Sequence, residues 1–277
     1  MTDQQLQDLA SRLQAFIDRH PRLLVLTGAG ISTDSGIPDY RDRQGNWKRQ
    51  PPVDHRDFVA SLSSRQRFWA RSLVGWPLMA AARPNGAHLA LAALERQGHV
   101  EQLVTQNVDG LHERAGSRRV IDLHGRSDSV ICLGCGARLE RDPLQQRLAR
   151  HNPAYCNHSA DAAPDGDADL ELDFSAFQVL DCEHCGGILK PDVVFFGDNV
   201  PRPRVEAALS ALHRADALLV VGSSLMVYSG FRFCRIAATL NKPIAAINLG
   251  RTRADDLLSL KLEAPAAAVL DRLSQIA

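Results

Sequence analysis

The residues Leu23-Leu24-Val25-Leu26-Thr27-Gly28-Ala29-Gly30 join an uninterrupted apolar run to a glycine turn. An apolar run that ends at Gly-x-Gly is typical of a buried parallel strand whose carboxyl end meets a nucleotide. Glycines there let backbone N–H groups approach a pyrophosphate, and the start of the next helix adds a favourable dipole. A tight turn without any ligand explains the two glycines alone equally well. The stretch therefore predicts an α/β fold and poses the hypothesis of a dinucleotide site.

The rest of the chain repeats such apolar runs in alternation with amphipathic stretches. Together with the first run, Arg22–Thr27, the sequence predicts buried strands at Val100–Thr105, Val120–Leu123, Ala217–Val221 and Pro243–Asn248. Helices are predicted over Met1–His20, Ala87–Arg96, Val205–Arg214, Ser229–Leu240 and Ala266–Ile276. Alternating strands and helices are typical of an open, doubly wound parallel sheet, so we expect a Rossmann-type α/β core.

Two segments interrupt the alternation, and we expect both as insertions into one domain of residues 1–277. Residues 45–83 hold a polar loop and then a helix with Phe68, Trp69 and Leu73 on its apolar side. Residues 128–189 carry two C-x-x-C pairs and predict a small zinc-binding module. Residues 152–177, which are rich in Asp and Glu and lack Lys and Arg, are expected as a solvated, mobile loop rather than a site. The core is then built from about residues 20–44, 84–127 and 190–277.

Charge and composition exclude some classes of protein. The chain has 277 residues, and 32 Lys and Arg balance 32 Asp and Glu, so the basic surplus of a nucleic-acid-binding protein is missing. Residues 1–20 lack the pattern of a secretory signal, and no apolar run is long enough for a transmembrane helix. We therefore expect a cytoplasmic protein that binds neither nucleic acid nor membrane. The oligomeric state stays open.

Four of the six cysteines form the two C-x-x-C pairs Cys132/Cys135 and Cys182/Cys185, each with glycines close by. Four thiolates in two tight knuckles suit one tetrahedral, structural Zn²⁺. A redox role is the alternative, but it needs only one such pair. Cys156 with His158 is a weaker metal candidate, and Cys234 is expected in the core.

Polar residues follow several of the predicted strands, at the edge where an open α/β sheet binds its ligand. These segments are Gln106-Asn107-Val108-Asp109, Gly222-Ser223-Ser224 and Asn248-Leu249-Gly250. Asn and Asp can hold ribose hydroxyls, and Gly-Ser-Ser offers donors to phosphate, although each segment alone could be a helix cap. His124 follows another strand and could take a proton from a ribose hydroxyl near neutral pH. Most of the other histidines are expected at the surface.

The glycine turn departs from the dehydrogenase pattern. Thr33 stands in place of the third glycine, and no acidic residue ends a second strand about 20 residues further on. A long polar loop, residues 32–41, follows instead and could fold over the nicotinamide end of a bound dinucleotide. Ordinary hydride transfer is therefore disfavoured.

These motifs together resemble the sirtuins. Gly28-Ala29-Gly30-Ile31-Ser32, Gly36-Ile37-Pro38-Asp39-Tyr40-Arg41, Gln106-Asn107-Val108-Asp109, His124-Gly125, the two cysteine pairs, Phe196-Gly197-Asp198, Gly222-Ser223-Ser224 and Asn248 occur in the order seen in that family. The likeness runs from about Arg22 to Asn248. Phe68-Trp69-Ala70-Arg71 with Gly75-Trp76-Pro77 is similar to the class II branch.

The resemblance implies an NAD-dependent protein-lysine deacetylase or deacylase. The acyl oxygen of a modified lysine would attack the nicotinamide ribose and expel nicotinamide, and the acyl group would end on ADP-ribose. His124 would be the general base and Asn107 its catalytic companion at the nicotinamide ribose. NAD contacts are implied at Gly28, Ala29, Gly30, Ser32, Asp39, Tyr40, Arg41, Trp47, Gln106, Asp109, Gly222, Ser223, Ser224, Asn248, Leu249 and Gly250. Val194, Phe196 and Gly197 would receive the acylated lysine of a protein substrate, with the peptide added as a strand.

Several features depart from the family pattern or leave alternatives open. Tyr40 replaces a common Phe, Asp198 replaces a common Glu, and the long segment 136–181 is expected to cover the site in part. The succinyl-selective members use a Tyr and an Arg three residues apart. Phe68 and Arg71 lack the hydroxyl, so succinyl preference is not expected, whereas acetyl, longer-chain and lipoyl-type groups stay open. Protein mono-ADP-ribosyl transfer, or a non-catalytic NAD-sensing zinc module, are the competing functions.

Overall fold

The computed structural model describes residues 1–48, 52–158 and 165–276. A six-stranded parallel sheet has the order β3-β2-β1-β7-β8-β9. Its strands are β1 (Leu23–Thr27), β2 (Val100–Thr105), β3 (Val120–Asp122), β7 (Ala217–Val221), β8 (Ile244–Ile247) and β9 (Leu260–Leu262). The chain builds outward from β1 to β3 and then returns to β7 on the other side of β1. The predicted doubly wound sheet is confirmed, and its topological switch point lies between β1 and β7.

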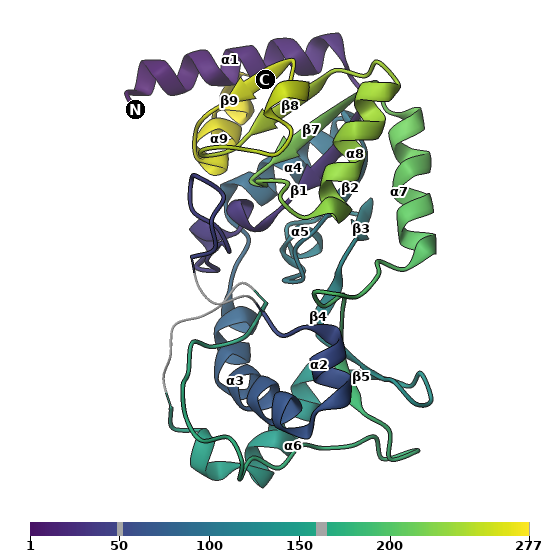
Figure 1. The fold of residues 1–277 in the computed structure, drawn as a ribbon. Coiled ribbons are helices and arrows are strands. Elements are labelled where there is room, and N and C mark those ends of the chain that lie inside the picture. The colour runs from purple at the N-terminus through teal and green to yellow at the C-terminus, as the bar shows by residue number, and fades with distance from the viewer. Residues whose placement is uncertain (49–51, 159–164, 277) are drawn as a thin grey trace.

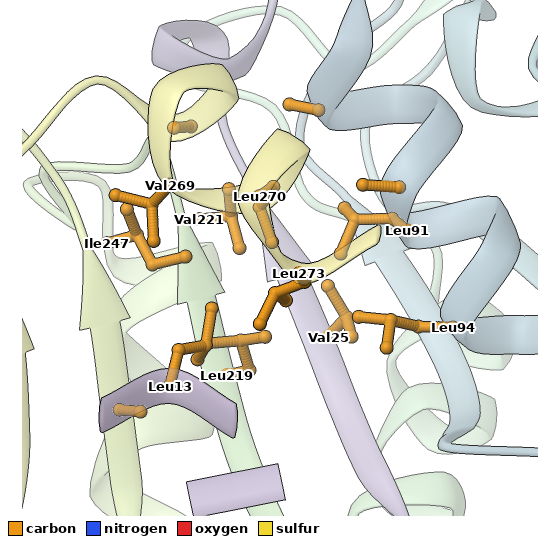
Figure 2. Packing of buried hydrophobic residues seen from close by; sticks show 14 of the residues in the cluster. Leu13, Val25, Leu91, Leu94, Leu219, Val221, Ile247, Val269, Leu270 and Leu273 are labelled. Carbon is orange, nitrogen blue, oxygen red and sulfur yellow. The ribbon is translucent and has the colours of Figure 1, made fainter. Parts of the chain in front are cut away.

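Helices cover both faces of this sheet. One face packs against α1 (Asp3–Arg19), α4 (Gly86–Arg96) and α9 (Ala266–Ile276). Figure 2 shows the cluster they form with the sheet, with Leu13 beside Leu219 and Leu270 beside Val221. The other face packs against α7 (Arg202–Arg214) and α8 (Tyr228–Thr239) through the alternate residues Leu24, Leu26, Leu218 and Val220. Since successive strand residues point to opposite faces, the continuous apolar runs are explained by burial on both sides.

A smaller module lies beyond the carboxyl edge of the large sheet, at the lower end of Figure 1. Its antiparallel sheet has the order β5-β4-β6, from β5 (Arg138–Glu140), β4 (Gly125–Cys132) and β6 (Leu189–Val193). Helices α2 (His55–Ala60), α3 (Leu62–Ala81) and α6 (Arg141–His151) complete it, and the short α5 (Leu111–Arg114) follows β2 in the core. Phe58, Phe68, Trp69 and Phe177 form its own hydrophobic core.

Part of the acidic loop differs from the expectation. Residues 165–177 contact α3 and bury Ala168 and Phe177, although residues 171–173, 175 and 176 are exposed. Arg71 of α3 donates from its Nε to both carboxylate oxygens of Asp167, at 2.9 and 3.0 Å. The expectation of a solvated loop is therefore wrong for residues 165–168, where a cation far away in the sequence compensates the acidic charge, while residues 171–173, 175 and 176 are exposed as expected. Residues 159–164 of the same loop lie outside the described residues.

Candidate active site

The glycine turn sits at the switch point of the sheet. Gly28 donates its N–H to the Val221 carbonyl at 3.1 Å, and Gly30 donates to the Gly222 carbonyl at 2.8 Å. A Cβ at Gly30 would lie 2.9 Å from the Gly222 carbonyl oxygen, and one at Gly28 would lie 2.8 Å from the Ser223 Cβ. Glycine is therefore required by the close approach of two strand ends, which brings the turn and Gly222-Ser223-Ser224 to one place.

A cavity of about 390 Å³ opens beside this turn, between the large sheet and the small module. The residues predicted to contact NAD or peptide line it together, with one exception. They are Gly28, Ala29, Gly30, Ser32, Asp39, Tyr40, Arg41, Trp47, Gln106, Asn107, Asp109, His124, Val194, Phe196, Gly197, Gly222, Ser223, Ser224, Asn248 and Leu249. Gly250 is not among the lining residues. A Cβ there would lie 2.3 Å from the Arg43 carbonyl oxygen, so Gly250 supports the loop that carries Arg41.

Three polar side chains that follow β1 and β2 are locked together at the floor of the cavity. Ser32 donates its hydroxyl to Asp109 at 2.7 Å, and the Asn107 amide donates to the Ser32 hydroxyl at 3.0 Å. The second oxygen of Asp109 accepts the Leu111 N–H at 2.9 Å. Burial raises the pKa of Asp109, and these hydrogen bonds oppose that rise. The arrangement presents fixed amide and carboxylate groups suited to sugar hydroxyls.

His124 is held at both ring nitrogens. Its Nδ1 lies 2.8 Å from the Gln106 carbonyl oxygen, and its Nε2 lies 2.8 Å from the Ser229 hydroxyl. A carbonyl oxygen can only accept, so Nδ1 carries the proton and Nε2 offers its lone pair. Burial lowers the pKa of His124 to about 4; the Gln106 bond opposes this, and the charges of Arg204 and Arg232 assist it. His124 is therefore neutral near pH 7, as a general base must be.

An aromatic cluster joins the loop after the glycine turn to the predicted peptide segment. The rings of Tyr40 and Trp47 pack edge-on against Phe196, with centroid distances of 6.5 and 5.5 Å. The Arg41 guanidinium lies 4.0 Å from the centre of the Trp47 ring. An ion pair between Lys48 and Asp39 ties the same loop together. These contacts hold the loop that carries Tyr40 and Trp47 against Phe196, in the segment that follows β6.

Sequence reasoning missed further residues that line the cavity, among them two of the acidic loop and two of α8. Asp165 and Asp167 reach it from the acidic loop, and Ser229 and Arg232 reach it from the first turns of α8. Burial and the nearby charge of Asp167 raise the pKa of Asp165 to about 7. The acidic residues were visible in the sequence, but their surroundings depend on the fold. Ser229 and Arg232 carry no motif of their own.

The four paired cysteines come together as one cluster at the far end of the small module. Their Sγ atoms all lie within 4.8 Å of one another, and Cys132 and Cys182 are the buried pair. The Sγ separations are 3.4 Å for Cys132–Cys185 and 3.8 Å for Cys135–Cys182. Tetrahedral Zn²⁺ with Zn–S bonds of about 2.3 Å places its sulfurs about 3.8 Å apart. The donor set fits a closed, structural Zn²⁺ site.

The parallel doubly wound sheet, the cavity at its switch point and the four-cysteine module define a dinucleotide-site protein with a structural metal module. The model of the Sir2 family matches residues 28–229. A "NAD-dependent protein deacetylase" of Xanthomonas campestris is 62% identical over 264 residues, which is 95% of this chain and 90% of the relative. The "NAD-dependent protein deacylase Sirt4" of Drosophila melanogaster is 46% identical over 97% of this chain and 87% of its own. The chain belongs to the Sir2 family.

Solved structures agree with this assignment. A Sir2 protein bound to an acetylated peptide matches with a TM-score of 0.75 and 29% identity, over 96% of this chain and 97% of that one. A Sir2 protein with a p53 peptide and NAD+ also matches with a TM-score of 0.75 and 29% identity, over 100% and 98%. The predicted family and fold class are confirmed. Within the described residues, no helix is long and apolar enough to cross a membrane.

Proposed function

We infer that this protein is an NAD-dependent protein-lysine deacetylase, which moves an acyl group from lysine to ADP-ribose and releases nicotinamide. The main support is the setting of His124, a neutral imidazole that lines the same cavity as the glycine turn, Asn107 and Asp109. Its Nε2 is bonded to Ser229, which also lines this cavity. The Xanthomonas campestris relative is named for the same activity. NAD is a consumed co-substrate in this proposal, and the acylated lysine of a protein is its partner.

Different side chains would have different roles in such a reaction. Ser32, Asn107 and Asp109 would orient the nicotinamide ribose through their fixed hydrogen bonds. Gly222, Ser223 and Ser224 would donate to phosphate beside the glycine turn. His124 would take a proton from a ribose hydroxyl at Nε2 once nicotinamide has left. Val194, Phe196 and Gly197 would receive the peptide, because Val194 follows β6 and already donates its N–H to the His124 carbonyl at 2.7 Å.

The test compares wild type with His124→Ala on an acetyl-lysine peptide with NAD present, measured as the rate at which deacetylated peptide forms. Loss of a general base lowers the rate by about 10²–10⁴-fold. His213→Ala, at an exposed histidine of α7, is the control and should keep wild-type turnover. Wild-type product formation by His124→Ala would refute the assigned mechanism.

We propose that the preferred acyl groups are neutral. Among the described residues of this wall of the cavity, Asp167 pairs with the Arg71 guanidinium and Asp165 lies beside this pair. An acyl carboxylate would therefore meet two acidic side chains on this wall. Acetyl-lysine and longer neutral acyl-lysine peptides should react faster than a succinyl-lysine peptide. Asp167→Asn should raise succinyl turnover relative to acetyl turnover because Arg71 loses its partner. A wild-type preference for succinyl-lysine would contradict the proposal.

Protein mono-ADP-ribosyl transfer would use the same NAD cavity. Incubation with NAD labelled in its adenosine and with an acylated protein separates the two reactions. Deacetylation leaves the label on a small molecule, whereas transfer leaves it covalently on protein. A non-catalytic NAD-binding module would cleave no NAD with any acyl substrate. The metal-type arrangement of the four cysteines suits a reducing compartment, so we propose that the enzyme works in the cytoplasm.

A further inference from the structure

The hydroxyl of Ser229 hydrogen-bonds His124, the candidate general base, and does not cap its own helix, α8. Ser229 is the second residue of α8, and the cap of this helix, Val227, makes no side-chain capping bond. Among the described residues, the Ser229 hydroxyl forms one hydrogen bond, the 2.8 Å contact to His124 Nε2. The hydroxyl also lines the cavity. Its position therefore lets it act on the atom of His124 that would take the proton.

Gln106 and Ser229, the two hydrogen-bond partners of His124, belong to segments that pack against each other. Gly230 follows Ser229, and a Cβ at Gly230 would lie 2.4 Å from the Gln106 side-chain oxygen. Gln106 itself donates from its amide to the Ser223 hydroxyl at 2.8 Å and to the Thr27 carbonyl at 3.1 Å. The start of α8 thus packs directly on the residue whose carbonyl holds Nδ1. The imidazole is clamped from opposite sides by two elements that leave it little freedom to turn.

A hydroxyl suits this position because it both donates and accepts. In the resting enzyme Ser229 donates to the Nε2 lone pair. When a ribose hydroxyl binds at Nε2, the Ser229 O–H turns away and frees the Nε2 lone pair. The ribose O–H bond then breaks, an Nε2–H bond forms, and the Ser229 oxygen accepts a hydrogen bond from the new N–H. Among the described residues no carboxylate is bonded to His124, while Arg204 and Arg232 oppose its positive charge. An oxygen acceptor at Nε2 would stabilise the imidazolium without making the resting ring charged.

We propose that Ser229 is a positioning residue of this enzyme, which clamps His124 with Nε2 toward the cavity and accepts a hydrogen bond from it after proton transfer. The proposal rests on the role of His124 proposed above. No sequence motif indicated that the first turn of α8 would position His124.

The experiment measures two steps separately in wild type, Ser229→Ala, Ser229→Thr, His124→Ala and Ser229→Ala/His124→Ala. Exchange of labelled nicotinamide into NAD, with an acetylated peptide present, reports cleavage of the nicotinamide bond, which needs no base. Formation of deacetylated peptide reports the later step that does. Thr239→Ala, at the other end of α8, is the matched control.

Loss of one hydrogen bond to the base predicts about three- to tenfold slower product formation in Ser229→Ala. The rate of nicotinamide exchange and the KM for NAD stay at wild-type values in Ser229→Ala. Ser229→Thr restores the rate of product formation. In the His124→Ala background, Ser229→Ala has no further effect. Wild-type product formation by Ser229→Ala, equal losses in both steps, or an additive loss in the double variant would each overturn the proposal. Full activity of His124→Ala would instead refute the proposed function, so the two failures are distinguishable.

Discussion

At the residue scale, two further histidines are buried near the end of β1. His88 and His112 lie with ring centroids 4.8 Å apart, and His112 Nε2 lies 2.9 Å from the Thr27 hydroxyl at the end of β1. Burial lowers the pKa of His88 to about 4 and the pKa of His112 well below 6.5. Most of the other histidines are exposed or partly exposed, as expected, and these two are the exceptions among them. Both rings are neutral parts of the core.

This burial predicts a loss of stability in acid. The unfolded chain takes up protons on His88 near pH 6.5, while the folded protein resists until about pH 4, so stability is full above pH 6.5 and falls as the pH drops toward 4. A shift of this size corresponds to about 3 kcal/mol. His88→Gln should flatten the dependence of the unfolding free energy on pH by about 1.4 kcal/mol per unit in this range. Denaturant unfolding at several pH values measures it. An unchanged slope would contradict the prediction, and His213→Gln, at the surface, serves as control.

At the element scale, α3 and residues 165–177 depend on each other. A Cβ at Gly75 of α3 would lie 2.5 Å from the carbonyl oxygens of both Gly166 and Asp167. These are backbone atoms, so Gly75→Ala must push the segment away from the helix, at a cost of about 1–3 kcal/mol. We expect faster amide exchange in residues 165–177 and a lower Tm. Leu78→Ala changes an exposed residue of the same helix and should alter neither. If amide exchange in residues 165–177 stayed as slow in Gly75→Ala as in wild type, the contact with Gly75 would not stabilise this segment.

The same elements show what could be predicted from the sequence. The large sheet was predictable because β1, β7 and β8 are short apolar runs buried on both faces, and β2 ends in the buried residues Leu103–Thr105. β4 alternates buried and exposed residues and has no such run, so only its cysteine marked the region. The docking of Asp167 depends on Arg71, a partner 96 residues away, which no local pattern reveals. The cavity-lining motifs were predictable as residues, whereas their mutual hydrogen bonds were not.

At the scale of the whole molecule, two strands connect the cysteine cluster to the cavity. His124 directly precedes β4, which ends at Cys132, and β6 runs antiparallel from Leu189 back to the predicted peptide segment. The pairing of Cys132 with Leu189 at one end and Gly125 with Val193 at the other joins these strands along the module. The cluster therefore stabilises, through the length of β4 and β6, the backbone that presents His124 and Val194.

Removal of the metal should abolish deacetylation while leaving the large sheet folded. Each module has its own hydrophobic core, so loss of Zn²⁺ should release β4–β6 and the core around Phe58 and Trp69, but leave the packing of Val25 and Val221. Treatment with a strong chelator, or Cys185→Ser, should raise amide exchange in β4–β6, lower the Tm and stop turnover of an acetylated peptide. Exchange in β1 and β7 should stay slow, and added Zn²⁺ should restore the chelated protein. Cys156→Ser, at an exposed cysteine outside the cluster, controls for loss of a thiol. Full activity without metal would mean that strand pairing alone holds the site, whereas fast exchange throughout the chain would mean that the two modules unfold as one.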